Sequence, residues 1–383
     1  MHHHRVWAEI DCDAIAHNYR ALRGHVAPAT KIMAVLKADA YGHGAVMVAK
    51  LLEAQKLDAI GVGDSQEALE LRDSGINLPI LILGTIVPGE IDLVIGAGVQ
   101  ANLHSLEMAR EIAAVARRMG KVAEVQLKID TGMGRLGADP YQAVRILRAL
   151  RTMPNLKLRG INTHFSSAGE ASRTFTERQL SRFLPVVELA KTLGYHDLTI
   201  HAANHAAAIS MPHAHFDMVR PGLALYGLSG AAPEFVTPLD LKRVLTLKTQ
   251  VAFIKDVAEG TPVSYDRKWY AQAPTRIATL PVGYNDGLPV QLTNRAQVLI
   301  HGRRAPMVGR IAMDYVMVDV GAIPGVKRGD IVTLIGRDGN EEIKIEELAN
   351  LLGTVPYAVS CGLGRRVRRV YTGRSMASLS NAA

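Results

Sequence analysis

The chain has 383 residues, of which 48% are hydrophobic, 21% charged and only 5% aromatic, and its 44 basic and 36 acidic side chains give a formal charge of +8. This length is sufficient for two domains with substantial cores. No apolar run approaches the roughly 18 residues of a membrane-spanning helix, and no apolar signal segment follows the N-terminus, so we expect a cytoplasmic protein without a membrane partner.

Short, continuously apolar runs alternate with helical patterns through the first two-thirds of the chain. We expect strands at Ile32–Leu36, Ala59–Val62, Ile80–Leu83, Val99–Leu103, Val125–Ile129, Leu158–Thr163, Leu198–His201 and Met218–Arg220. Such runs are typical of strands covered on both faces. Ser105 and Asp139-Pro140 are start signals for two of the helices between them. Eight alternations predict a closed parallel (β/α)8 barrel. An open doubly wound sheet also fits, but no G-x-G-x-x-G follows the first strand.

After about Gly230 the pattern changes. The segment 229–238, "SGAAPEFVTP", is typical of a linker. Strands dominate beyond it, in the runs "VLTLKTQVAFI", "TRIATLPV", "QVLI", "YVMVDV" and "DIVTLI", with an Asp-Gly hairpin turn in Gly336–Glu341 and one helix in "IEELANLL". We predict an α/β barrel over 1–235 and a mostly antiparallel β domain over 236–383, with the first few residues of the chain pairing with the β domain.

Part of the basic charge lies near the C-terminus, at Arg365, Arg366, Arg368, Arg369 and Arg374. A basic patch is one mark of nucleic-acid binding, but "GRRVRRVY" alternates like a strand with a charged face, and stacking aromatics are scarce. We therefore expect no nucleic-acid partner and interpret the charge as attracting small anions. The two cysteines form no disulfide or zinc pattern. The N-terminal histidines fit either a tag remnant or a native segment and do not count toward a metal site, so we expect no metal.

Candidate site residues gather at the predicted strand ends, where barrels of this type carry their sites. They are Lys37, Tyr41, Leu83, Lys128, Arg135, His164, His201, Asn204, His205, Arg220, Gly222 and Leu223. A lysine alone at a strand end is more often a solvated cation than a functional group. Lys37 is placed before a flexible turn with two glycines. Because so many candidate residues are expected on the same rim, we interpret Lys37 as part of a functional site.

The rim favours carbonyl chemistry. Burial in the mouth of a barrel is expected to lower the pKa of Lys37 and make it a nucleophile toward carbonyls. Glycine-bordered turns after the seventh and eighth strands are the usual phosphate site of this architecture. A cofactor-free aldolase and a pyridoxal phosphate enzyme both fit these features.

The motifs "AVLKADAYGHG", "LKIDTGMGRLG", "HAAN", "MVRPGLALYGL", "VSYDRKWY", "LPVGYNDG" and "GRIAMD" resemble, in order, the motif series of the alanine racemases. The match runs from about Arg5 to Tyr371. That family consists of fold type III pyridoxal phosphate enzymes with an α/β barrel and a C-terminal β domain. The resemblance implies interconversion of L- and D-alanine, D-alanine supply for peptidoglycan, and a homodimer with shared active sites.

The resemblance also implies roles for individual residues. Lys37 holds pyridoxal 5'-phosphate as an aldimine and moves the α-proton on one face of the substrate, while Tyr265 from the partner subunit acts on the other face. His164 and Arg220 are implied to supply the positive charge that Tyr265 needs as a base. Further residues implied to bind the cofactor are Tyr41, Leu83, His201, Asn204, His205, Gly222, Leu223 and Tyr357.

Two arginines have specific implied tasks. Arg220 donates to the pyridine nitrogen of the cofactor, which a guanidinium cannot protonate, and this favours racemisation over transamination. Arg135 binds the substrate carboxylate, oriented by Lys128, the position at which family members often carry a carbamylated lysine. Met313 is implied to donate its backbone N–H to the same carboxylate, and Tyr284 to narrow the entrance.

The sequence departs from the family pattern at a few positions. His205 stands where a phosphate-binding serine is usual; a protonated imidazole could donate instead, but the geometry of the hydroxyl is lost. Asp266 stands where glycine often follows the catalytic tyrosine. If its carboxylate faces the site it raises the pKa of Tyr265, unless Arg267 or Lys268 offsets it. Ala312 and Ala358 are smaller or less polar than common family residues.

Other functions remain as alternatives. A racemase of serine or of broad specificity fits the same residues. A basic amino acid decarboxylase of this fold would place an acid where Arg220 stands and use a β-domain cysteine in a motif that Cys361 does not match. A non-catalytic pyridoxal phosphate carrier would lack the whole β domain with Tyr265.

Overall fold

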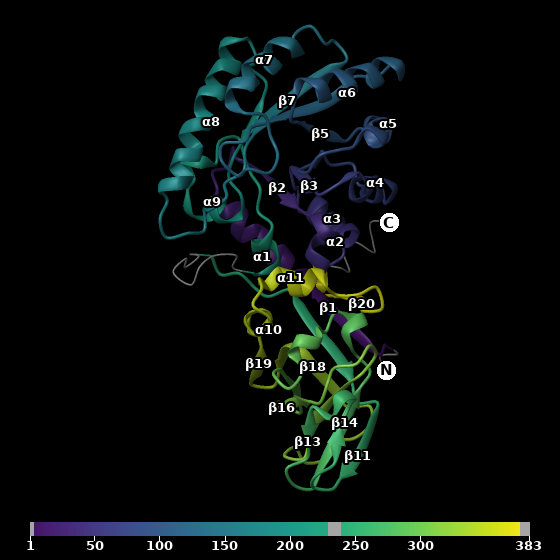
Figure 1. Ribbon diagram of the computed structural model, residues 1–383. Helices are drawn as coiled ribbons and strands as arrows, with labels where there is room; N and C mark the ends of the chain where they lie inside the picture. Colours follow the sequence, from purple (N-terminus) through teal and green to yellow (C-terminus); the bar gives the residue numbers. More distant parts are fainter. Residues whose placement is uncertain (1–3, 229–238, 376–383) are drawn as a thin grey trace. The chain divides into compact units, whose positions relative to one another are not determined.

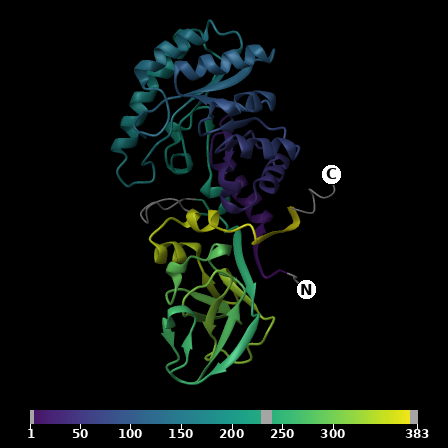
Figure 2. The ribbon, with the colours of Figure 1, turned by 45° about the vertical axis from the view of Figure 1, so that its right-hand side comes forward.

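The computed structural model describes residues 4–228 and 239–375. The chain folds as two compact units, drawn as ribbons in Figures 1 and 2. In its described part the barrel unit comprises 14–40, 44–228 and 239–242, and the β unit comprises 4–13, 41–43 and 243–375. The predicted boundary between residues 235 and 236, and the predicted linker 229–238, lie outside the described residues.

The barrel unit contains eight parallel strands, as predicted. They are β2 (Lys31–Val35), β3 (Ala59–Val62), β4 (Ile80–Ile82), β5 (Gln100–Leu103), β6 (Ala123–Lys128), β7 (Leu156–Asn162), β8 (Thr199–His201) and β9 (Met218–Val219). Their order is β8-β7-β6-β5-β4-β3-β2-β9. Backbone bonds from Asp217 N to Ile200 O and from Arg220 N to Ala203 O, each 3.0 Å, join the two ends of this sheet. The sheet is therefore a nearly closed barrel, which confirms the predicted fold class.

Helices follow the strands and cover the sheet in Figure 1. They are α1 (Cys12–His25), α2 (Lys37–Gly42), α3 (Ala45–Ala54), α4 (Ser65–Asp73), α5 (Ile91–Gly96), α6 (Leu106–Arg118), α7 (Pro140–Leu150), α8 (Thr174–Thr192) and α9 (His205–Ser210), with 3-10 turns η1 (Pro88–Glu90), η2 (Pro212–Ala214) and η3 (Leu223–Tyr226). Ser105 accepts from Met108 N at 3.1 Å and Asp139 from Tyr141 N at 2.8 Å, so both predicted start signals cap their helices.

The inner face of the barrel changes character along its length. Met33, Ala59, Leu81 and Met218 form an apolar cluster against which Leu83 packs. Side chains alternate along a strand, and on β5 to β8 the same face carries buried polar groups, among them Asn102, Gln126, Asn162 and His201. Buried polar groups persist only when they are hydrogen-bonded, and these bonds are described with the site below.

The β unit is a mostly antiparallel sheet with the order β11-β14-β17-β16-β15-β18-β10-β1-β20, with β19 added on β18. Its strands are β1 (Val6–Asp11), β10 (Leu245–Gln250), β11 (Phe253–Val257), β14 (Thr275–Leu280), β15 (Gln297–Ile300), β16 (Arg303–Val308), β17 (Val316–Asp319), β18 (Ile331–Asp338), β19 (Glu341–Ile343) and β20 (Arg368–Thr372), beside the hairpin of β12 (Pro262–Val263) and β13 (Trp269–Tyr270). β1 pairs antiparallel with β10 and parallel with β20.

Short helices complete the β unit: α10 (Ile345–Leu352), α11 (Pro356–Cys361), and the 3-10 turns η4 (Tyr265–Arg267), η5 (Tyr284–Asp286) and η6 (Val290–Leu292). α10 is the predicted helix, whereas α11 was not predicted. The apolar run "VLTLKTQVAFI" was predicted as one strand and is two, because β10 pairs with β1 and β18 while β11 pairs with β14.

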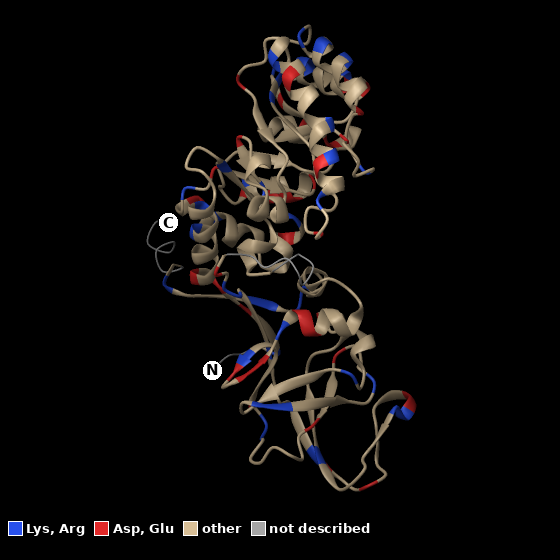
Figure 3. Cartoon of the chain, turned by 90° about the vertical axis from the view of Figure 1, so that its left-hand side faces the viewer, with Lys and Arg blue, Asp and Glu red and all other residues tan. Residues whose placement is uncertain are grey.

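Several basic residues near the C-terminus have structural partners. Arg369 donates to the carbonyls of Gly42, Leu363, Gly364 and Val367 at 2.9–3.2 Å. In the view of Figure 3, Lys and Arg lie interspersed with Asp and Glu along the helices of the barrel unit. Within the described ranges, every helix is too short or too polar to cross a membrane.

Candidate active site

The segment after β2 has an unusual backbone. Lys37 opens α2, and the next four residues, Ala38 to Tyr41, have φ of 53°, 52°, 53° and 55°. Left-handed backbone costs roughly 1–2 kcal/mol per non-glycine residue, so consecutive residues hold it only when their surroundings impose it. The prediction of a flexible turn here was wrong, because the lysine is carried by a left-handed helical turn.

The half-buried carboxylate of Glu67 stabilises this turn. Glu67 Oε1 accepts from Ala38 N at 2.5 Å, and Oε2 accepts from Gly63 N at 2.7 Å. At the far end Asp39 Oδ1 accepts from Ala45 N at 2.7 Å. Burial raises the pKa of Glu67, although these N–H donors oppose the shift. The backbone direction of Lys37 is therefore set by tertiary contacts rather than by local preference.

Positive side chains converge at the carboxyl end of the barrel strands. Lys128, at the end of β6, is only 6% exposed. Its pKa is lowered to about 7 by burial and by the positive charges of Arg220, Arg135 and Lys37, with Asp130 opposing them. The structure thus brings these predicted site residues together on one rim. Lys37, for which the sequence predicted a lowered pKa, is exposed within the single chain.

Arg220 lies at the centre of this group and is 4% exposed. Nη1 donates to His201 Nδ1 at 2.8 Å, and Nη2 donates to Thr163 O at 2.7 Å, Ala202 O at 3.1 Å and His164 Nδ1 at 3.2 Å. Burial lowers the pKa of Arg220 to about 10, so the group remains charged at neutral pH.

Both histidines beside Arg220 are neutral. Burial and the charges of Arg220 and Lys128 hold the pKa values of His164 and His201 well below their usual range. Because a guanidinium only donates, each Nδ1 that faces it must accept. The expectation that His164 supplies positive charge was therefore wrong, and Arg220 carries that charge alone of the two.

The loop after β8 positions the next pair. Asn204 caps α9, accepting from Ala207 N at 3.2 Å, and its Nδ2 donates to Phe165 O at 3.0 Å. Burial lowers the pKa of His205 to about 4. The predicted protonated imidazole is therefore wrong: His205 is neutral at physiological pH and has a single N–H to donate. Gly222 and Leu223 follow β9, where Gly222 precedes η3 and Leu223 opens it.

In the β unit the structure places two predicted tyrosines side by side. The rings of Tyr41 and Tyr357 meet edge to face, with centroids 6.1 Å apart and an interplanar angle of 86°. Gly42, at φ 84°, makes the approach feasible, since a Cβ there would lie 2.1 Å from the carbonyl oxygen of Ser360. Only glycine satisfies both the backbone and the space.

Gly42→Ala should therefore destabilise the protein more than a positive φ alone explains. Gly75 has a matching φ of 86° and open space around its Cα, so Gly75→Ala is the control and should cost about 1 kcal/mol. Gly42→Ala should cost roughly 2 kcal/mol more, because the Ser360 carbonyl must move. Thermal unfolding midpoints of the two variants measure the difference, and equal midpoints would show that the close approach is absent.

Two further loops of the β unit bring Tyr284 and Met313 together. Tyr284 N donates to Ala312 O at 3.1 Å, and Asn285 N donates to Met313 O at 3.2 Å. The side chains of Tyr284 and Met313 are 44% and 52% exposed. Arg366 stabilises the pair of loops, because it bonds both Asp286, at 3.0 Å, and Asp314, at 2.7 Å.

Tyr265 stands in η4 and is 67% exposed. Its neighbours Ser264, Asp266 and Arg267 have φ of 66°, 60° and 48°. Ser264 Oγ donates to Arg310 O at 2.5 Å, and the Asp266 carboxylate forms an ion pair with the Arg310 guanidinium. These contacts join the tyrosine loop to the segment that leads to Met313.

The comparisons with known proteins decide the family. The model of the alanine racemase N-terminal domain matches residues 10–230, and that of the C-terminal domain matches residues 244–371. The chain belongs to the alanine racemase family.

Individual alanine racemases are similar over nearly the whole chain. The enzyme of Methanococcus maripaludis is 41% identical over 96% of this chain and 99% of its own. The structure of the Bacillus anthracis alanine racemase with bound L-Ala-P has a TM-score of 0.92 at 33% identity, over 98% of this chain and 97% of that one. The Bartonella henselae alanine racemase with covalently bound pyridoxal phosphate has a TM-score of 0.85 at 30% identity, over 96% and 99%.

The structure explains one departure from the alanine racemase pattern. Asp266 occupies a left-handed position, which glycine adopts without strain and aspartate tolerates better than most residues. Its carboxylate pairs with the guanidinium of Arg310, a partner that the sequence did not predict, and the offset by Arg267 or Lys268 stays a prediction. The partner could not be read from the sequence, because Arg310 lies 44 residues away.

The sequence did not predict two side chains that shape the site of this alanine racemase family member. Glu67 follows Asp64 by three residues, a spacing that predicts only a helix start, yet its carboxylate reaches the Lys37 turn. Gln126 alternates with Lys128 on one face of β6 and accepts from His201. A polar residue inside an otherwise apolar strand was the signal that pointed to it.

Proposed function

We propose that the chain interconverts L- and D-alanine with pyridoxal 5'-phosphate as cofactor, and so supplies D-alanine for peptidoglycan in the cytoplasm. Membership of the alanine racemase family supports this proposal. The observation that carries it is the cationic rim, where Lys37, Arg135 and Arg220 lie close enough to Lys128 for their charges to lower its pKa. Such a field favours an anionic cofactor and a substrate carboxylate.

The residues present fit pyridoxal phosphate. Within residues 4–228 and 239–375 the hydrogen bonds of Arg220 start from Nη1 and Nη2, which leaves Nε–H as a donor for a ring nitrogen. Lys37 offers an amine for the aldehyde. The Tyr41 and Tyr357 hydroxyls, His205, and the backbone at Gly222 and Leu223 would bind the phosphate, with Leu83, His164, His201 and Asn204 around the ring. When bound, pyridoxal phosphate withdraws electrons from the substrate α-carbon and acidifies its proton.

The chain's own groups would move that proton. Lys37 would remove or return it on one face of the α-carbon, and Tyr265 of a second copy would do so on the opposite face. Arg135 would hold the substrate carboxylate through two parallel hydrogen bonds, assisted by Met313 N–H, with Tyr284 at the entrance. Arg220 keeps its proton at neutral pH, since its pKa is about 10, so it donates a hydrogen bond without protonating its acceptor.

A homodimer with shared sites is part of the proposal. Tyr265, Tyr284, Met313 and Tyr315 of the β unit are 67%, 44%, 52% and 43% exposed. Large apolar side chains gathered at the surface commonly mark a protein interface. A second copy of the chain would cover them and bring Tyr265 to a cationic rim.

Lys128 is proposed to be carbamylated. At a pKa of about 7, roughly half of its amines are uncharged at neutral pH and able to add CO2. The resulting carbamate would turn a repulsive contact with Arg135 into an attractive one. Because the uncharged fraction rises with pH, the KM for alanine should fall as the pH rises from 6 to 8.

A matched variant isolates this effect. In Lys128→Met the KM for alanine should be about tenfold higher and should no longer change across that pH range, because the carboxylate that orients Arg135 is missing. Intact-mass spectra under native conditions should show one CO2 adduct in the parent protein only. A parent protein of unmodified mass, with a flat KM, would reject the carbamate.

The function itself is tested by chiral product analysis. Purified protein with pyridoxal phosphate and L-alanine should yield D-alanine until the two enantiomers are equal. L-serine serves as the competing substrate. Formation of D-serine faster than D-alanine would identify serine, rather than alanine, as the substrate. If neither D-amino acid forms while pyridoxal phosphate binds, the chain is a cofactor carrier rather than a racemase.

A further inference from the structure

A line of hydrogen-bonded side chains crosses the inside of the barrel from its carboxyl end to its amino end. Arg220 Nη1 lies 2.8 Å from His201 Nδ1, and His201 Nε2 lies 2.5 Å from Gln126 Oε1. Gln126 Nε2 donates to Gln100 Oε1 at 2.8 Å, and Gln100 Nε2 donates to Glu124 Oε2 at 3.1 Å. Four links therefore connect a guanidinium at the site rim to a carboxylate at the other end of β6.

The two ends of this line impose one direction on every bond in it. Arg220 can only donate, so while the guanidinium keeps this position His201 Nδ1 accepts and the proton of the neutral imidazole resides on Nε2. The Glu124 carboxylate can only accept, and Arg159 donates to its other oxygen, Oε1. The amides of Gln100 and Gln126 then have a single orientation that satisfies both neighbours.

Reversing the donor–acceptor direction of these hydrogen bonds is costly, because the groups at the rim end of the line are buried. His201 is 0%, Gln126 3% and Arg220 4% exposed. Asn162 strengthens the middle of the line, because its Nδ2 donates to Asn102 Oδ1 at 2.8 Å and approaches Gln126 Oε1 at 3.4 Å. Around His201 and Gln126 a reversed bond would leave two donors or two acceptors facing each other in a low-dielectric interior, whereas Gln100 and Glu124 are half-buried.

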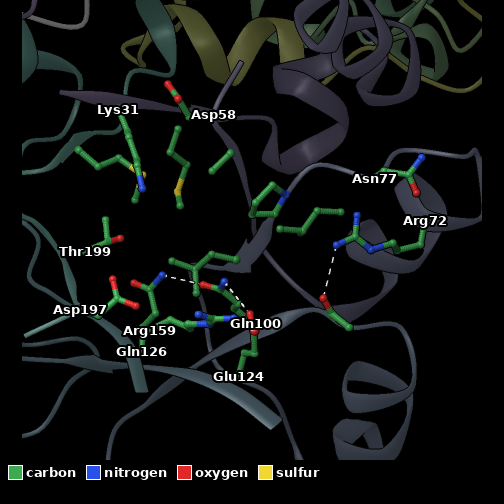
Figure 4. A pocket seen from close by; sticks show the side chains of 17 residues that line it. Lys31, Asp58, Arg72, Asn77, Gln100, Glu124, Gln126, Arg159, Asp197 and Thr199 are labelled. Atoms are coloured by element: carbon green, nitrogen blue, oxygen red, sulfur yellow. Dashed lines mark hydrogen bonds and ion pairs between the residues drawn. The ribbon is translucent and has the colours of Figure 1, made fainter. Parts of the chain in front are cut away.

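The far end of the line opens into a separate cavity. Gln126, Gln100 and Glu124 line a pocket of about 390 Å³, together with Arg159 and residues that begin the strands, such as Lys31 and Thr199. Figure 4 shows the dashed bonds from Gln126 to Gln100 and from Gln100 to Glu124 within it. Burial raises the pKa of Glu124, but Arg159 and Gln100 together bring it below its ordinary value. The carboxylate that ends the line, which we call the anchor, therefore remains charged.

We propose that Glu124, through Gln100 and Gln126, is a positioning residue for Arg220, because it holds His201 as the neutral Nε2–H tautomer. With Nδ1 always an acceptor, the guanidinium has one place to bond. The opposite tautomer would set an N–H against a guanidinium N–H and displace Arg220. The consequence for catalysis rests on the proposed function, in which Arg220 donates to the cofactor ring, whereas the tautomer itself does not.

Nuclear magnetic resonance of protein labelled with 15N-histidine tests the tautomer directly, without cofactor or substrate. The His201 signals are assigned by their loss in His201→Gln. In the parent protein Nε2 should have the shift of a protonated nitrogen and Nδ1 that of an unprotonated one. Signals of the Nδ1–H tautomer, or of an imidazolium at neutral pH, would overturn the proposal.

Glu124→Gln tests the anchor. An amide at 124 both donates and accepts, so the direction is no longer imposed from this end, and the two His201 shifts should move toward each other. In the loaded enzyme kcat should fall about tenfold while the KM for alanine changes by less than about twofold, since Arg135 is untouched. Glu188→Gln is the matched control, because Glu188 also pairs with a cation, Lys191, but on an exposed helix face. This control should change neither the His201 shifts nor kcat.

A second variant covers failure of Glu124→Gln to fold. Gln100→Met interrupts the line one residue further in and should produce the same change in the His201 shifts. Unchanged shifts in a folded variant of either kind would overturn the proposal. If the shifts behave as expected but the parent protein forms no D-alanine, the proposed function fails and the positioning role stands; a working racemase with unmoved shifts gives the reverse result.

Discussion

Lys37→Ala is expected to abolish alanine racemisation and to remove the visible absorption of bound pyridoxal phosphate. The amine of Lys37 has two tasks in the proposal, the covalent attachment of the cofactor and the transfer of the α-proton on one face. Loss of a single acid–base group typically reduces the rate by about 10²–10⁴-fold, and the lost attachment adds to this. Racemisation should therefore fall by at least about a thousandfold.

A control variant and an added amine distinguish the loss of the Lys37 amine from a general effect of the substitution. Lys50→Ala, on the exposed side of α3, is the control and should retain full activity and absorption. Methylamine added to Lys37→Ala should restore part of the rate, because a free amine can occupy the space of the missing side chain. A Lys37→Ala protein that keeps both its absorption spectrum and its rate would refute the assignment of the cofactor lysine.

The barrel and its rim could be predicted because their signals are local. Each strand is a short apolar run, and helix starts such as Ser105 and Asp139 are marked by residues whose side chains bond the next turn. Parallel strands of a barrel end on one rim, so residues that follow those strands had to meet. Lys128, Arg135 and Arg220 were grouped in this way, and their mutual effect on the pKa of Lys128 fits that grouping.

The left-handed turn after Lys37 could not be predicted, because its cause is not local. Alanine and aspartate favour right-handed helix over left-handed backbone, and the turn depends on the Glu67 carboxylate, 29 residues further along the chain. Asp266 is the same kind of case, since its partner Arg310 comes from another loop. In both places a contact between distant segments overrides the preference of the residue.

The protonation states of two histidines were predicted wrongly for a different reason. His164 and His205 were expected to act as cations, but burial depends on the finished fold and favours the neutral imidazole. The pKa of His205 falls to about 4, and that of His164 falls further below its usual range because Arg220 lies beside it. Strand β16 was missed because Pro306 lies within it, and a proline argues against a strand when only the sequence is read.

Tyr265→Ala is expected to separate the two faces of the substrate. The equilibrium between enantiomers is fixed, so net racemisation must slow in both directions whichever base is lost. Exchange of the α-proton with deuterium from solvent is not bound by that constraint. Lys37 remains in the variant, so one enantiomer should still exchange with retention of configuration, while exchange from the other should fall by about 10²-fold or more. Equal losses for both enantiomers would contradict the assignment of one base to each face.

The same pair of variants tests whether the site is shared between copies. Lys37→Ala and Tyr265→Ala should each be inactive alone. If Lys37 acts with Tyr265 of a second copy, a mixed dimer places both defects in one site and leaves the other site intact. Random mixing should then restore about a quarter of the parent activity. Mixed dimers verified by native mass spectrometry that remain inactive would place both bases in one copy, because every site would then carry a defect.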